Sequence, residues 1–169
     1  MFSLIVPLLL VACGSSRHAA TTARHIATQE IHGPGFAFST PAAWRLGHTF
    51  SAATATSRAK RPATVSAELY RLGKAYTDAQ FAAAAKELDG VATRLARAAG
   101  TTVGLRESTI VDGRRIRAYR FTASTGDAVR VGFLLDGKRE IQLLCQAPRG
   151  PADPDGACGL LFATFRLTG

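Results

Sequence analysis

The 169-residue sequence contains no Asn, one Met and one Trp, and it has only 12 acidic side chains against 21 Lys and Arg. It also lacks any apolar run near the roughly 20 residues that a membrane-spanning helix needs. Charged residues make up 20% of the chain and hydrophobic residues 47%, which is an ordinary globular composition. These numbers exclude a multi-span membrane protein, a collagen-like fibre and a wholly disordered chain. The length is that of one domain with a core large enough to fold alone.

The sequence patterns of common enzymes are absent as well. There is no HExxH, GxSxG, P-loop or GxGxxG pattern, and the acidic residues are scattered. His18, His25 and His32 are evenly spaced but lie mostly in a segment where no helix is expected, so we interpret them as solvated side chains; His48 lies apart. We therefore expect no catalysis, no metal and no cofactor. The alternative is a small envelope hydrolase or metal-dependent enzyme whose groups meet only in the folded chain.

An uncharged apolar segment opens the sequence. From Leu4 to Ala12 every residue is apolar or Pro, which is too short to span a membrane but suits the hydrophobic region of a secretory signal. The segment ends Leu10-Val11-Ala12-Cys13, which resembles the lipobox of bacterial lipoproteins. That resemblance implies a signal peptide over 1–12 and a lipid-modified Cys13 at the mature N-terminus. The alternative is a buried strand that ends in a core cysteine.

The composition changes after this segment. Residues 13–32 are mostly Ser, Ala, Thr, Arg and His, with few large apolar side chains, so we expect a flexible tether. A single folded domain is expected over 33–169. Because several acyl chains anchor a protein stably, we expect an extracytoplasmic protein that is held on the bacterial cell membrane without spanning it.

Two further cysteines lie near the end of the chain. The residues between Cys145 and Cys158 are rich in Pro, Gly and Asp and form a loop by composition. An exported protein meets an oxidising compartment, where paired cysteines usually bridge. We predict a disulfide, which would stabilise the fold by roughly 3 kcal/mol in the chain-entropy model. The alternative is two unpaired buried cysteines.

The first half of the expected domain contains strands followed by one long helix. Alternating Phe residues predict a strand at 36–38, with a turn at 40–43 and a returning strand from 44 to 46; residues 51–63 suit an exposed loop, and 64–72 a strand. The helix is expected over 78–99, between a capping box and a terminal glycine. Its apolar stripe at helical spacing consists of Phe81, Ala84, Ala85, Leu88, Val91, Ala92 and Leu95.

The second half predicts four consecutive strands. Asp-Gly and Gly-Asp pairs between short β-rich runs are strong hairpin signals. The expected strands are 103–111, 114–123, 128–135 and 138–147, with turns at Asp112-Gly113, Ser124-Thr125-Gly126-Asp127 and Asp136-Gly137. An apolar run at 158–165 suits a short closing helix. The fold class is therefore α+β: a twisted antiparallel sheet, made of an N-terminal hairpin and a four-strand meander, with one long helix packed on it.

A family resemblance supports this arrangement. The segment Gly35-Phe36-Ala37-Phe38-Ser39-Thr40-Pro41-Ala42-Ala43-Trp44 resembles the opening of Mog1/PsbP-like domains, which carry a GF-x-F-x-x-P-x-x-W pattern. The resemblance extends over about residues 33–167. It implies a fold and is compatible with an exported lipoprotein, but it transfers no catalytic residue.

The basic residues are the remaining candidate site. Arg114, Arg115, Arg117 and Arg120 crowd one expected strand, and a second group lies in the expected loop. We expect a binding or scaffold protein whose basic sheet face engages anionic lipid, an acidic wall polymer or an envelope protein. Nucleic acid is not an expected partner. The alternatives are a solvated Arg-rich surface and an apolar pocket between helix and sheet. The candidate anion-binding residues are Arg58, Lys60, Arg61, Arg115, Arg117, Arg130 and Arg139.

Overall fold

Two antiparallel sheets and two α-helices form the protein in the computed structural model, which describes residues 27–148 and 156–168. The expected signal peptide and Cys13 lie outside these residues. The six-stranded sheet has the order β3-β4-β5-β8-β7-β6, and the three-stranded sheet the order β1-β2-β9. The elements are β1 (Thr28–Gly33), β2 (Phe36–Pro41), β3 (Arg45–His48), β4 (Ala52–Thr56), β5 (Thr64–Tyr76), a 3-10 turn (Asp78–Gln80), α1 (Phe81–Ala98), β6 (Leu105–Val111), β7 (Arg114–Thr122), β8 (Ala128–Ala147), α2 (Ala157–Thr164) and β9 (Arg166–Leu167).

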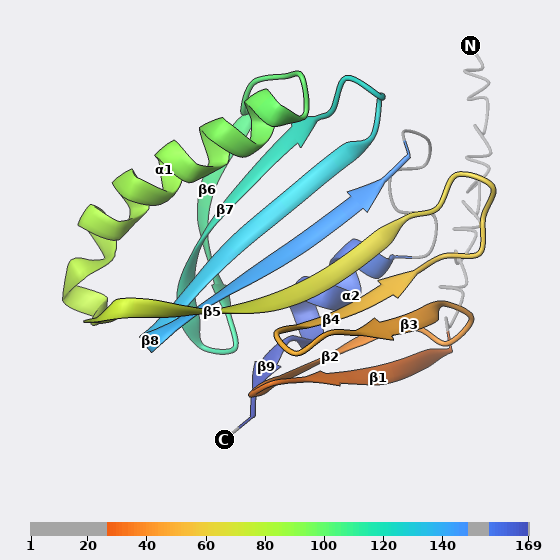
Figure 1. The fold of residues 1–169 in the computed structure, drawn as a ribbon, viewed down its shortest axis with the longest axis horizontal. Helices are drawn as coiled ribbons and strands as arrows, with labels where there is room; N and C mark the ends of the chain where they lie inside the picture. Colours follow the sequence, from red (N-terminus) through yellow and green to blue (C-terminus); the bar gives the residue numbers. More distant parts are fainter. Residues whose placement is uncertain (1–26, 149–155, 169) are drawn as a thin grey trace, which may run out of the picture.

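The two faces of the six-stranded sheet are covered differently (Figure 1). Helix α1 lies on one face, where its buried residues meet Tyr119 and Phe121 of β7 and the odd-numbered residues at the start of β8. Helix α2 and the three-stranded sheet pack on the other face, around Phe36 and Phe38. The α+β fold is confirmed. No helix within 27–148 or 156–168 is long and apolar enough to cross a membrane.

The N-terminal strands pair differently from the expected hairpin. β2 pairs with β1 and β9, whereas β3 pairs with β4 in the other sheet. The hairpin prediction was therefore wrong: Pro41 stays paired with Thr28 of β1, and the turn after it, in which the Trp44 N–H donates to the Pro41 carbonyl at 3.1 Å, leads the chain into the other sheet. The boundary of the tether was also wrong, because Thr28–Gly33 form β1 and bury Ile31.

Strand β4 lies inside the segment that was expected to be a loop. Ala53 and Ala55 are fully buried and the residues between them are partly exposed, which is the alternation of a half-buried strand. Alanine is depleted in strands, so composition pointed away from this element. Only residues 57–63 remain a loop between β4 and β5.

The long helix agrees with its prediction. The Thr77 N–H donates to Gln80 Oε1 at 2.8 Å, which is half of the expected capping box. Gly100 adopts φ +71° after the last turn and donates to the Arg97 carbonyl at 2.9 Å. The predicted apolar stripe faces the sheet, with Leu88, Ala92 and the adjacent Ala96 buried.

The predicted meander is correct at its first two turns and wrong at the third. β8 runs through Asp136-Gly137 as one 20-residue strand. Gly137 adopts φ +57° there, and Asp136 forms ion pairs with Arg114 and Arg139. Before this point the odd-numbered residues of β8 face α1, and after it they face α2, so the Asp-Gly pair forms a bulge that exchanges the two faces. β5 has a matching register shift between Arg71 and Tyr76.

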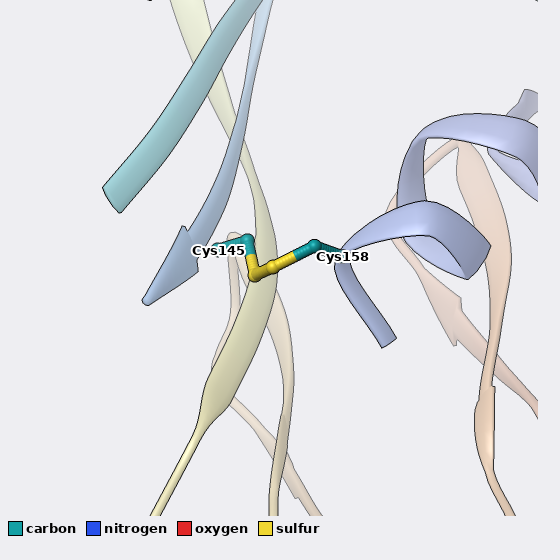
Figure 2. The surroundings of a disulfide bond; sticks show 2 residues. All are labelled: Cys145 and Cys158. Atoms are coloured by element: carbon teal, nitrogen blue, oxygen red, sulfur yellow. A yellow bond between two sulfur atoms is a disulfide. The ribbon is translucent and has the colours of Figure 1, made fainter. Parts of the chain in front are cut away.

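The predicted disulfide joins Cys145 of β8 to Cys158 of α2, with the Cα atoms 5.5 Å apart (Figure 2). Cys145 is 1% exposed, so the bond lies against the core. α2 has few polar side chains and buries Leu161 and Phe162. The disulfide therefore fixes this apolar helix to the face of the sheet that α1 leaves uncovered.

Candidate anion-binding site

The seven predicted basic residues do not form one face. Arg115 and Arg117 alternate with Ile116 and Ala118 and point to the α1 side of β7, whereas Arg130 points to the α2 side of β8. The other residues are distributed over the β8 bulge and the loop between β4 and β5; these are Arg139, Arg58, Lys60 and Arg61.

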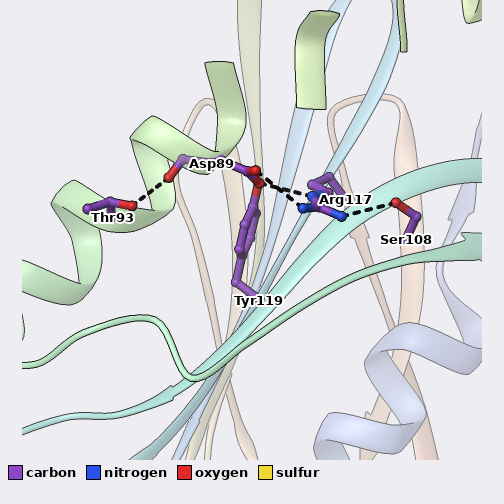
Figure 3. A network of polar contacts seen from close by, with 5 residues as sticks. All are labelled: Asp89, Thr93, Ser108, Arg117 and Tyr119. Atoms are coloured by element: carbon purple, nitrogen blue, oxygen red, sulfur yellow. Dashed lines mark hydrogen bonds and ion pairs between the residues drawn. The ribbon is translucent and has the colours of Figure 1, made fainter. Parts of the chain in front are cut away.

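Arg117 belongs to a polar cluster that joins α1 to β7 (Figure 3). Its Nε and Nη2 donate to the two carboxylate oxygens of Asp89 at 3.0 and 3.3 Å, and the Tyr119 hydroxyl donates to Asp89 at 2.7 Å. Nη1 of Arg117 donates to Ser108 at 3.3 Å. Partial burial acts to raise the pKa of Asp89, but hydrogen bonds from Arg117 and Tyr119 outweigh it and hold that pKa below its ordinary value. The charge of Arg117 is thus already neutralised.

Most of the other candidates also have intramolecular partners. The Arg115 guanidinium lies 5.0 Å from the centre of the Phe81 ring. Arg61 forms an ion pair with Asp127 at 2.8 Å, and Arg139 forms one with Asp136. Arg58 donates to the carbonyl of Ala43 at 3.1 Å, and Lys60 is exposed in the same loop as Arg58. These contacts bind elements of the fold to one another.

Within the described residues, Arg130 is the candidate that has a buried nitrogen without a hydrogen-bond partner. It lies directly opposite Arg120 on β7, and both guanidinium groups donate to the same oxygen of Glu107, at 3.4 and 3.2 Å. Two cations thus share one carboxylate. The Arg130 guanidinium lies 3.9 Å from the centre of the Phe162 ring, and no atom of residues 27–148 or 156–168 accepts a hydrogen bond from its buried Nε. Burial and the charge of Arg120 lower the pKa of Arg130.

A hollow of about 580 Å³ adjoins this pair of arginines. It is lined by Arg120 and Arg130, by Thr101 and Thr102 from the segment after α1, and by apolar side chains from β7 and β8. Guanidinium groups bind phosphate and carboxylate through parallel N–H donors. The arrangement therefore combines excess positive charge, one donor without a partner among the described residues, and space for an oxyanion.

Sequence analysis placed Arg130 in the candidate set but missed Arg120 and Glu107. The sequence feature that could have revealed Arg120 as the partner of Arg130 is the hairpin between β7 and β8. Its observed register pairs Thr122 with Ala128 and therefore Arg120 with Arg130. The expected strand ends, at 123 and 128, differ from this register by one residue. A shift of one residue in the pairing register moves every side chain of a strand to the other face. The expected strand ends therefore did not predict that Arg120 and Arg130 lie opposite each other.

The rest of the described chain gives no competing metal centre: within 27–148 and 156–168, no group of three or more His, Cys, Asp or Glu side chains could hold an ion.

Comparison with known proteins bears on the fold alone. No family model matches the sequence, and no curated protein matches it. Among solved structures, the chain is similar to cyanobacterial PsbP (CyanoP) from Synechocystis sp. PCC 6803, with 10% identity, a TM-score of 0.59 and coverage of 94% of this chain and 98% of that one. It is also similar to a protein of Bacteroides thetaiotaomicron, with 12% identity, a TM-score of 0.51 and coverage of 83% of this chain and 48% of that one. The chain spans about half the length of the Bacteroides protein. The fold is PsbP-like.

Proposed function

We propose that the protein is an exported, lipid-anchored binding protein of the bacterial envelope, which binds an oxyanionic group through Arg120 and Arg130. The proposal is supported by the lipobox-like segment that ends in Cys13 and by the disulfide at Cys145 and Cys158, which suits an oxidising compartment. The observation that carries the binding role is the Arg130 Nε, which lies buried beside a hollow and has no partner in the part of the chain that the structure describes.

An oxyanion would relieve two unfavourable features of the free site. A buried donor without a partner destabilises a protein by about 1–3 kcal/mol, and two guanidinium groups around one carboxylate repel each other. A phosphate or carboxylate in the hollow would supply both an acceptor and a negative charge. Anionic lipids, acidic wall polymers and acidic surfaces of envelope proteins all present such groups.

The anchor is tested by fractionating bacteria that express the full chain. The wild-type protein is expected in the membrane fraction, carrying labelled fatty acid. The Cys13→Ala variant is expected to carry no label, because it lacks the sulfur to which the lipid would be attached. Equal labelling of the two proteins would contradict the anchor.

The oxyanion site is tested by titrating inorganic phosphate into the full Cys13→Ala chain in neutral detergent and following the arginine Nε–Hε resonances by NMR. We expect a saturable shift of the Arg130 resonance, absent in chloride of equal ionic strength. Arg130→Lys keeps the charge but loses the planar donor set, so phosphate affinity should fall about fivefold or more. Arg139→Lys is the matched control, because Arg139 is paired with Asp136. Equal effects of the two variants, or no phosphate binding, would contradict the site.

A further inference from the structure

A second hollow, of about 380 Å³, lies between the first half of α1 and the six-stranded sheet. It is bounded by residues 72–76 of β5, where the ladder to β8 is interrupted, and by the β8 bulge. On α1 the lining positions include Ala83 and Ala84. Small side chains above an irregular stretch of strand leave this space unfilled. It is separate from the arginine site and shares no lining residue with it.

The lining of this hollow combines an apolar floor with acidic groups. The floor consists of Leu72, Leu88, Val91 and Leu135. The charged groups of the lining are two carboxylates and one ammonium group, those of Glu87, Glu140 and Lys74. The formal charge of the hollow is therefore −1, although the whole chain carries +9. A local negative charge in a basic protein favours a cationic ligand.

Glu140 is the exceptional group in this lining. It is partly buried on the α1 side of β8, and within the described residues no hydrogen bond or ion pair reaches its carboxylate. Tyr70 lies opposite it on β5, but the Tyr70 hydroxyl donates to Glu68 at 2.8 Å. Burial raises the pKa of Glu140. A partly buried charge without a partner is unfavourable, and carboxyl groups perturbed in this way in a cavity are common in ligand sites.

We propose that this hollow binds a small amphiphilic cation, an aliphatic amine or ammonium compound, whose charged end pairs with Glu140 and whose apolar body lies against Leu88, Val91 and Leu135. The volume falls within the range of small-ligand pockets, and the combination of an apolar floor with few polar groups is typical of them. The ammonium would satisfy the carboxylate that the protein leaves unpaired. This inference is independent of the oxyanion site and of the lipid anchor.

The experiment uses three probes that share one alkyl chain: octylammonium, octanol and octanoate. Each probe is titrated into the full Cys13→Ala chain in neutral detergent. Binding is followed by the NMR chemical shifts of the backbone amides of the residues that line the hollow. We expect octylammonium to bind best and octanoate at least about tenfold more weakly, because only the ammonium can donate a charged hydrogen bond to the Glu140 carboxylate. Glu140→Gln should weaken octylammonium about tenfold and leave octanol unchanged.

Two helix variants locate the site. Ala83→Trp places a large ring at the hollow and should abolish binding of both octylammonium and octanol. Ala82→Trp, at an adjacent exposed position that does not line the hollow, should preserve it. The melting temperature of each variant reports whether it is folded. Octanoate binding as tightly as octylammonium, Glu140→Gln without effect on octylammonium, or equal loss in Ala82→Trp and Ala83→Trp would overturn the proposal.

Discussion

The two faces of the six-stranded sheet have different kinds of packing. On the α2 face, the rings of Phe36, Phe38 and Phe165 stack with centroids 5.8 and 6.4 Å apart, and a disulfide holds the covering helix. On the α1 face a single helix buries only Leu88 and two small residues, Ala92 and Ala96, of its own. Hollows of about 380 and 340 Å³ lie along this helix. We call the α2 face closed, because aromatic rings fill its centre and the hollow of about 580 Å³ lies to one side, beside Arg120 and Arg130. We call the α1 face open, because its hollows lie along the covering helix itself.

The difference implies that the closed face contributes most to the stability of the fold, whereas the open face can accommodate a ligand. A dense aromatic core tolerates little change in volume, so the closed face fixes the fold. The open face is held by a smaller apolar cluster around Leu88 together with the polar contacts of Asp89 with Arg117 and Tyr119, and it leaves space that a ligand could occupy. Local opening free energies are lowest where few apolar contacts are buried. We expect α1 to be the less protected of the two helices.

The largest expected effect comes from loosening the closed face. The double variant Cys145→Ala/Cys158→Ala removes the disulfide, and the free energy of unfolding should fall by about 3 kcal/mol because the unfolded chain gains freedom. Urea denaturation of the wild type and the variant measures this difference. In hydrogen exchange the loss of protection should centre on α2 and β2. A greater loss on α1 would show that the two faces are not independent.

The elements predicted correctly were those with strong local signals. The helix had a capping residue pair, an apolar stripe and a terminal glycine, and each of these depends on residues within one or two turns of one another. The pairing could be predicted because two cysteines remain once Cys13 is assigned to the expected export signal, and an even number in an exported chain favours a disulfide. The GF-x-F opening of the domain, Phe36 and Phe38, resembles PsbP-like domains, and the structure has a PsbP-like fold.

The wrong predictions concern elements that are determined by contacts between segments far apart in the sequence. Asp136-Gly137 has the composition of a hairpin turn, but β8 continues because β5 offers a partner for its second half. An alanine-rich strand such as β4 forms only because a core is present to bury its small side chains. Likewise, no local pattern indicates that Asp89, on a helix, neutralises Arg117, on a strand. Nor does a local pattern indicate that Arg115 and Arg130 lie on opposite sides of the sheet.

The second expected effect concerns the polar attachment of the open face. Asp89→Asn removes the charge that Arg117 contacts, and the free energy of unfolding at pH 7 should fall by about 1–2 kcal/mol, since the pair is partly solvated. The pKa of Asp89 is lowered in the fold, so its contribution is present above the unfolded carboxyl pKa of about 4 and is lost as pH falls through the folded value. The variant should therefore approach the wild type in acid.

Chemical denaturation at pH 7 and at pH 3 measures this convergence. Glu87→Gln is the control on the same helix: its carboxylate is exposed, and no ion pair to it occurs in the described chain. A deficit of Asp89→Asn that persists unchanged at pH 3 would show that the lost packing of the side chain, rather than its charge, holds α1 on the sheet.

The last two variants compare one added methyl group on each face. Gly90 lies within α1, where a Cβ atom would meet only the flexible end of Arg94 at 3.7 Å. Gly90→Ala should raise the free energy of unfolding by about 1 kcal/mol through helix propensity.

Gly132 lies on the closed face, where a Cβ atom would be 2.8 Å from Phe162 and 3.0 Å from Ile116. Gly132→Ala should lower the free energy of unfolding by about 1–3 kcal/mol because the core is already filled. Denaturation curves for the two variants should therefore shift in opposite directions, and shifts of the same sign would remove the distinction between an open and a closed face.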